Sequence, residues 1–204
     1  MSLLTTSVMN FTCELAGKSS VPGGGGASAL AAAIGTALGS MVGEFTVGKK
    51  KYADVEADIK SLMKEAEDLR FELLKCIDDD ATAFEPLSKA YSIPKDEPGR
   101  DETMEKCLRD AAQIPFRILE LACKAVELHR DFADKGSVIM ISDAATGAAL
   151  LQGAIKGAAV NVKINTKSMK DRTYADELDS KVEQLVSKYV KLSEDIYNDV
   201  WNRL

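Results

Sequence analysis

Three consecutive aspartates, Asp78, Asp79 and Asp80, lie in a segment whose apolar residues recur at helical spacing. At about 100° per residue, Asp80 falls on the apolar stripe between Ile77 and Phe84, whereas Asp78 and Asp79 point away from it. A carboxylate on a buried stripe is costly unless it has a partner. Asp80 is therefore either held by a structural hydrogen bond or used as an acid or base, and the pattern alone leaves both readings open.

A second stretch that suits a ligand is the glycine run Gly23, Gly24, Gly25 and Gly26, which follows Pro22 and leads into a helix of small residues. Glycines let a ligand approach the backbone closely, and the unpaired N–H groups at a helix start suit an oxyanion. The same run is also typical of a flexible hinge. No Gly-Lys-Ser/Thr follows it and no apolar strand precedes it, which argues against both nucleotide-loop templates.

Lys49, Lys50 and Lys51 form the densest basic cluster of a chain whose formal net charge is −6. A charge run is usually a solvated face. This cluster, however, stands at the end of the small-residue helix, so an anionic ligand is a second reading.

Polar residues also mark a second small-residue helix. Ser142 is predicted to cap its start, and Asp143 suits the first turn, where a negative charge complements the helix dipole. Asn161 and Asn165 lie at its end, where an amide either hydrogen-bonds a ligand or caps the helix. His129, the single histidine, is placed near the polar end of another helix and is predicted to be a surface residue.

Six helices are expected to position these residues, and we expect an all-α helical bundle forming one domain over residues 1–204. The predicted ranges are 5–16, 26–42, 55–85, 101–131, 142–162 and 174–204, with an exposed loop over 92–100 and a kink or break at Pro115. Two central helices carry bare flanks made of Ala31, Gly35, Gly39 and Gly43, and of Ala149, Gly153, Gly157 and Asn161. These flanks predict close helix packing, and with the long terminal helix they predict a two-fold dimer.

Composition excludes several classes. The 46% hydrophobic and 28% charged content is that of a soluble globular protein, and the acidic balance argues against general nucleic-acid binding. Residues 27–43 are uncharged but too short and too rich in Ala and Gly for a membrane span. The four cysteines form no C-x-x-C pair, so we expect reduced thiols in the cytoplasm and, with a single histidine, no zinc site. The N-terminus has no charged region followed by an apolar core, so we expect no secretory signal.

The motifs together resemble the cyclodeaminase/cyclohydrolase family of folate enzymes, over nearly the whole chain and in the family's order. The matching runs are Leu15-Ala16, Val21–Gly25, Met41-Val42, Thr46–Tyr52, Asp78–Phe84, Ser92–Lys95, Ser142-Asp143 and Asn161–Asn165. The resemblance implies an all-helical homodimer that acts on a tetrahydrofolate derivative without metal and with no cofactor beyond that substrate. It also implies that the catalytic acid is Asp80, the second aspartate of the family's Asp-x-Asp-Ala-x-Ala-Phe motif.

Members of the family either close 5-formiminotetrahydrofolate to 5,10-methenyltetrahydrofolate with loss of ammonia, or interconvert methenyl- and 10-formyltetrahydrofolate with water. Both reactions need the same acid, so the sequence does not separate them. We expect Gly23–Gly26 to lie along the pterin or the aminobenzoate, and Lys49–Lys51 to meet the glutamate tail of a mono- or polyglutamylated folate. The alternative is a non-catalytic helical dimer that binds folate or serves as a scaffold.

Overall fold

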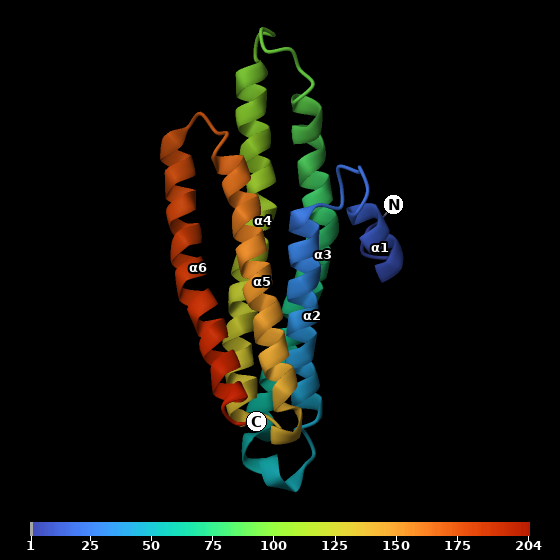
Figure 1. Ribbon diagram of the computed structural model, residues 1–204, viewed down its shortest axis with the longest axis vertical. Helices are drawn as coiled ribbons and strands as arrows, with labels where there is room; N and C mark the ends of the chain where they lie inside the picture. The colour runs from blue at the N-terminus through green and yellow to red at the C-terminus, as the bar shows by residue number, and fades with distance from the viewer. Residues whose placement is uncertain (1) are drawn as a thin grey trace.

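The computed structural model of the protein describes residues 2–204, which form six α-helices and no β-strand within that range (Figure 1). The helices are α1 Val8–Leu15, α2 Gly24–Glu44, α3 Glu56–Ala90, α4 Arg100–Lys135, α5 Ile141–Thr166 and α6 Arg172–Trp201, with short 3₁₀ turns at Lys50–Val55 and Val138–Met140. The expected all-α architecture is therefore confirmed.

Helices α2 to α6 run alternately down and up the bundle, while α1 stands beside it (Figure 1). The pairing of α3 with α4 extends above the start of α2, because α2 has 21 residues and its two neighbours have 35 and 36. At 1.5 Å per residue, α2 is about 30 Å long. Its start and its end are therefore well separated sites.

The two small-residue helices pack on each other, as predicted. A methyl group added at Gly35 of α2 would lie 3.0 Å from the Gly147 carbonyl oxygen of α5, and one added at Gly147 would lie 2.8 Å from the Gly35 oxygen. Only glycine permits this approach of the two backbones. The predicted flank on α5 is partly wrong, however, because Ala149 and Gly153 face outward and a methyl group at Gly153 would meet nothing within 4 Å.

His129 is buried rather than exposed, which corrects the expectation from sequence. Its Nδ1 lies 3.1 Å from the Ala144 carbonyl oxygen and its Nε2 lies 2.9 Å from the Gly35 carbonyl oxygen. Gly39 and Gly147 leave the space that the imidazole fills. Burial lowers the pKa of His129, so the ring is held neutral between the central helices.

Several helix boundaries differ from the predicted ones. α2 begins at Gly24, two residues earlier than expected, and α3 continues through Pro86 to Ala90. Pro115 does not divide α4. Ser142 is not a cap, since α5 already begins at Ile141.

Apolar residues at helical spacing form the core, and the stripe that carries Asp80 is among them. The buried members include Leu62, Ala66, Leu73 and Ile77 of α3, Ile118, Leu121, Ala125 and Leu128 of α4, and Leu178, Val182, Tyr189, Ile196 and Val200 of α6. Burying side chains of this size is the main stabilising contribution to the bundle.

By length and composition, two helices could cross a membrane: Gly24–Glu44 and Val138–Thr166. In their most apolar windows, 56% and 44% of the residues are buried inside the protein. The central helices of a soluble bundle pass the same test, so this finding is weak evidence for a span.

Candidate active site

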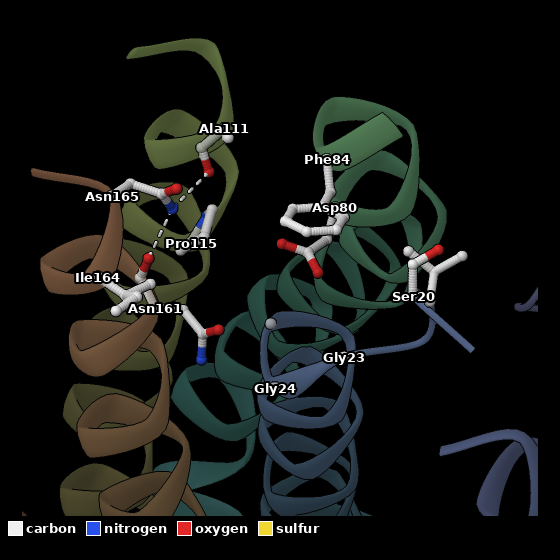
Figure 2. A pocket seen from close by; sticks show the side chains of 12 residues that line it. Ser20, Gly23, Gly24, Asp80, Phe84, Ala111, Pro115, Asn161, Ile164 and Asn165 are labelled. Carbon is white, nitrogen blue, oxygen red and sulfur yellow. Dashed lines mark hydrogen bonds between the residues drawn. The ribbon is translucent and has the colours of Figure 1, made fainter. Parts of the chain in front are cut away.

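A cavity of about 220 Å³ lies where α2 begins, between α3, α4 and α5 (Figure 2). Because α2 starts part of the way along the bundle, its first turn forms the floor and the longer helices form the walls. The lining residues are Ser20, Val21, Gly23, Gly24, Gly25, Asp80, Phe84, Ala111, Pro115, Asn161, Ile164 and Asn165. Among them Asp80 is the single carboxylate.

Asp80 projects from α3 onto the first turn of α2. The Gly26 N–H donates a hydrogen bond of 3.1 Å to Asp80 Oδ2. At Gly25, any β-carbon would collide with the carboxylate, so the glycine run is required for Asp80 to approach the helix start. The sequence left open whether Asp80 is held by a structural hydrogen bond or acts as an acid or base. The structure shows the hydrogen bond, and it also shows that the Asp80 carboxylate faces the cavity.

Two opposing effects act on this carboxyl group. Burial raises the pKa of Asp80, and the hydrogen bond from the Gly26 N–H lowers it by favouring the charged form; burial is the larger effect. The pKa of Asp80 is therefore raised above its ordinary value. A carboxylic acid with a raised pKa in a cavity holds its proton more readily than a free one, so it can act as an acid and, once ionised, as a base.

Asn161 and Asn165 stand on α5, on the side of the cavity opposite Asp80 (Figure 2). A methyl group at Gly24 would lie 2.8 Å from Asn161 Nδ2, so this glycine makes room for the amide. Asn165 is buried, and its Nδ2 donates to the Asn161 carbonyl oxygen at 2.9 Å. The cavity thus brings together two predicted amides, the glycine run and Asp80.

The structure does not bring the remaining predicted residues to this cavity. Lys49, Lys50 and Lys51 follow the far end of α2, about 30 Å from its first turn. Asp143 lies in the first turn of α5, whereas Asn161 lies near that helix's other end. Within one chain these four charged residues are at the end of the bundle opposite Asp80.

Sequence reasoning missed part of the cavity wall, namely Ser20, Ala111, Pro115 and Ile164. Pro115 carried a signal, since proline inside a long helix removes a backbone N–H and frees a carbonyl. The others depend on how the helices are aligned along one another, which no local pattern gives.

Asp78 has a separate, structural task. Its Oδ1 accepts hydrogen bonds from the Leu3 N–H at 2.6 Å and from the Leu4 N–H at 3.3 Å. It therefore fastens the N-terminal segment to α3, whereas the sequence predicted a plain surface carboxylate.

The fold and the site define an all-helical bundle whose cavity combines one half-buried acid, two amides and a glycine-lined helix start. The sequence profile of formiminotransferase-cyclodeaminase matches residues 7–184. Over 201 residues the chain is 35% identical to a methenyltetrahydrofolate cyclohydrolase of Methylorubrum extorquens, with 97% of each chain covered. The chain belongs to the formiminotransferase-cyclodeaminase family.

Two further relatives extend the comparison. The chain is 30% identical over 191 residues to the formimidoyltransferase-cyclodeaminase of Mus musculus, which covers 92% of this chain and 35% of the mouse protein. The crystal structure of a formiminotetrahydrofolate cyclodeaminase from Thermotoga maritima superposes with a TM-score of 0.85 at 26% identity, covering 98% of this chain and 99% of that one.

Proposed function

We propose that the protein is a tetrahydrofolate one-carbon enzyme that forms or consumes 5,10-methenyltetrahydrofolate. The observation that carries the proposal is Asp80, a half-buried acid with a raised pKa at the start of α2, inside a cavity with two amides. The family relationship supports the substrate class, because the relatives are named for reactions of methenyl- and formiminotetrahydrofolate.

Asp80 suits both directions of this chemistry. In cyclodeamination, N10 attacks the formimino carbon, and the leaving nitrogen gains the proton from N10 and one more from protonated Asp80. Ammonia departs, and the Asp80 carboxylate then lies beside the methenyl cation that it stabilises electrostatically. In hydrolysis, water adds to the methenyl carbon while the carboxylate accepts one of its two protons. The remaining hydroxyl proton moves to N5 as the bond between the carbon and N5 breaks, which gives 10-formyltetrahydrofolate and protonated Asp80.

An absorbance assay of the pure protein tests the proposal. Methenyltetrahydrofolate and 5-formiminotetrahydrofolate are supplied separately, and the methenyl absorbance is followed. Loss of signal from the first with no gain from the second identifies a cyclohydrolase, whereas a gain from the second identifies a cyclodeaminase. No change with either substrate would leave the non-catalytic folate-binding or scaffold dimer as the better reading.

We further propose that the enzyme is a homodimer that uses the outward faces of α2 and α5. These neighbouring helices expose large apolar side chains, namely Ile34 and Met41 on α2 and Val160 and Ile164 on α5. Exposure of such apolar side chains to water is unfavourable, and a two-fold contact between two copies would bury them. Sedimentation of a monomer at micromolar concentration would contradict this assembly.

A two-fold axis perpendicular to the helices would also resolve the distance between Asp80 and the lysines. It places the lower end of one subunit beside the upper end of the other, so Lys49, Lys50 and Lys51 would serve the partner's cavity. On this proposal the lysine cluster meets the carboxylates of a polyglutamate tail. We place the enzyme in the cytoplasm, with no metal and no cofactor beyond the folate substrate.

A further inference from the structure

The side-chain amides of Asn161 and Asn165 present oxygen atoms, rather than N–H groups, to the cavity. Asn161 Nδ2 donates to the Gly157 carbonyl oxygen at 2.8 Å, and Asn165 Nδ2 donates to the Asn161 carbonyl oxygen at 2.9 Å. Each amide thereby uses one N–H on a carbonyl of α5 itself. The two Oδ1 atoms are left as acceptors for a ligand that carries N–H donors.

Asn165 is held by a second contact that originates in α4. Pro115 has no N–H, so the Ala111 carbonyl lacks the donor that a helix normally provides four residues later. Asn165 Nδ2 lies 3.4 Å from that carbonyl oxygen and takes the donor's place (Figure 2). The proline thus fixes the orientation of the amide from the neighbouring helix, and the residue is only 8% exposed.

The two amides stand at different depths of the cavity. Asn161 packs on Gly24, next to the glycine that contacts the Asp80 carboxylate, so it marks the reacting end. Asn165 lies four residues further along α5, which is about 6 Å away along the helix axis. A fused-ring ligand with its reacting atoms at Asp80 therefore extends its other end towards Asn165.

We propose that Asn165 Oδ1 is the specificity-determining acceptor for the amino group on the pyrimidine edge of the pterin. This inference rests on the proposed folate activity. The 2-amino group of a pterin is a hydrogen-bond donor, and it lies on the far side of the ring system from N5 and N10. A folate that lacks this group would leave a largely buried acceptor unpaired, which is the situation in which a polar site discriminates strongly.

The test compares two ligands in two proteins by titration calorimetry. The ligands are 5-formyltetrahydrofolate and its 2-desamino-2-methyl counterpart, and the proteins are the wild type and Asn165→Ala. We expect the wild type to bind the amino ligand about 10- to 100-fold more tightly than the methyl ligand. In Asn165→Ala this preference should fall to about threefold or less, because the acceptor is gone.

Asn198→Ala, an exposed asparagine on α6, is the matched control and should keep the full preference. Pro115→Ala is the second variant, and it adds a helical N–H that competes with Asn165 for the Ala111 carbonyl. It should fold readily and lose part of the preference, because the amide then keeps only its hydrogen bond to the Asn161 carbonyl oxygen. Circular dichroism melting verifies the fold of each variant.

The outcomes separate this inference from the proposed function. A wild type that turns over methenyltetrahydrofolate but binds both ligands equally would overturn the role of Asn165 alone. The same conclusion follows if Asn165→Ala keeps the preference. A full preference in Pro115→Ala would overturn the part of Pro115 in orienting the amide. A wild type that neither binds 5-formyltetrahydrofolate nor turns over either substrate would contradict the folate activity itself, and with it this inference.

Discussion

At the scale of single residues, the site depends on a carboxyl group that the protein makes costly to ionise. Helical periodicity predicted Asp80 because burial along one helix is a local property of sequence. The same periodicity places His129 four residues after Ala125, on the buried face of α4. The prediction that His129 is a surface residue was wrong because it followed the polarity of the side chain and not its position on the helix. The space for that ring comes from Gly39 and Gly147 on two other helices, which no single segment reveals.

Replacing Asp80 by Asn keeps the shape of the side chain and removes proton transfer. We expect turnover to fall about 10²- to 10⁴-fold. Stability should hold or rise, because a neutral amide replaces a buried carboxyl group that can ionise. Asp79→Asn is the control and should change little, since Asp79 does not line the cavity. Full activity of Asp80→Asn would show that the residue is structural only.

The raised pKa of Asp80 also predicts how stability depends on pH. Because the folded pKa lies above the unfolded value of about 3.9, the folded state holds this proton more tightly. The stabilising contribution is complete below the unfolded pKa and is lost as the pH rises through the folded one. Asp80→Asn cannot titrate, so its stability advantage over the wild type should grow from acidic to neutral pH in denaturant titrations. An advantage that is constant with pH would contradict a raised pKa.

At the scale of elements, the sequence predicted that small-residue helices pack closely but not which of their residues touch. Gly147 faces Gly35 and the buried histidine ring, whereas Gly153 of the same helix faces outward. Both belong to one glycine-rich segment, and only the rotation of α5 against α2 tells them apart. Cavity residues such as Ala111 escaped prediction for the same reason, because they depend on helix alignment.

This difference predicts opposite effects of two alanine substitutions in α5. Gly147→Ala forces a methyl group onto the ring of His129 and towards the Gly35 carbonyl, and should destabilise by about 1–3 kcal/mol or more. Gly153→Ala meets no atom of its own chain within 4 Å and should stabilise the single subunit by about 0.5–1 kcal/mol, since alanine favours the helix. Because Gly153 lies on the outward face of α5 that we propose for the dimer, this value is measured at a protein concentration low enough to keep the subunits apart. Chemical denaturation measures both values, and equal effects would be incompatible with the packing described.

At the scale of the whole molecule, the sequence analysis assigned the lysine cluster and Asp80 to the same folate ligand. It did not predict the distance between them. The 21 residues of α2 fix that separation at about 30 Å within a chain. The length of the helix and the glycine run at its start were readable from the sequence, but the position of Asp80 at that start was not. The arrangement of two copies is what can bring the clusters together.

Replacing Lys49, Lys50 and Lys51 by Ala should therefore weaken the binding of polyglutamylated folate more than that of the monoglutamate. Fluorescence titration with the two ligands measures the difference, and equal weakening would argue against a role in binding the tail. Mixing this triple variant with Asp80→Asn then locates the contact. If the lysines serve the partner's cavity, mixed dimers contain one intact site and regain activity with polyglutamate. If the lysines act within their own chain, mixed dimers contain no intact site and activity is not regained.

The start of α2 has a consequence for how ligand size can change in this fold. The cavity exists because one helix begins lower than its neighbours, and each residue added to or removed from that start moves the floor by about 1.5 Å. The depth of the cavity thus depends on the number of residues at the start of α2, independently of the side chains on the cavity walls. Insertions or deletions just before Gly24 would make the site shallower or deeper in discrete steps, while the acid and the amides keep their places.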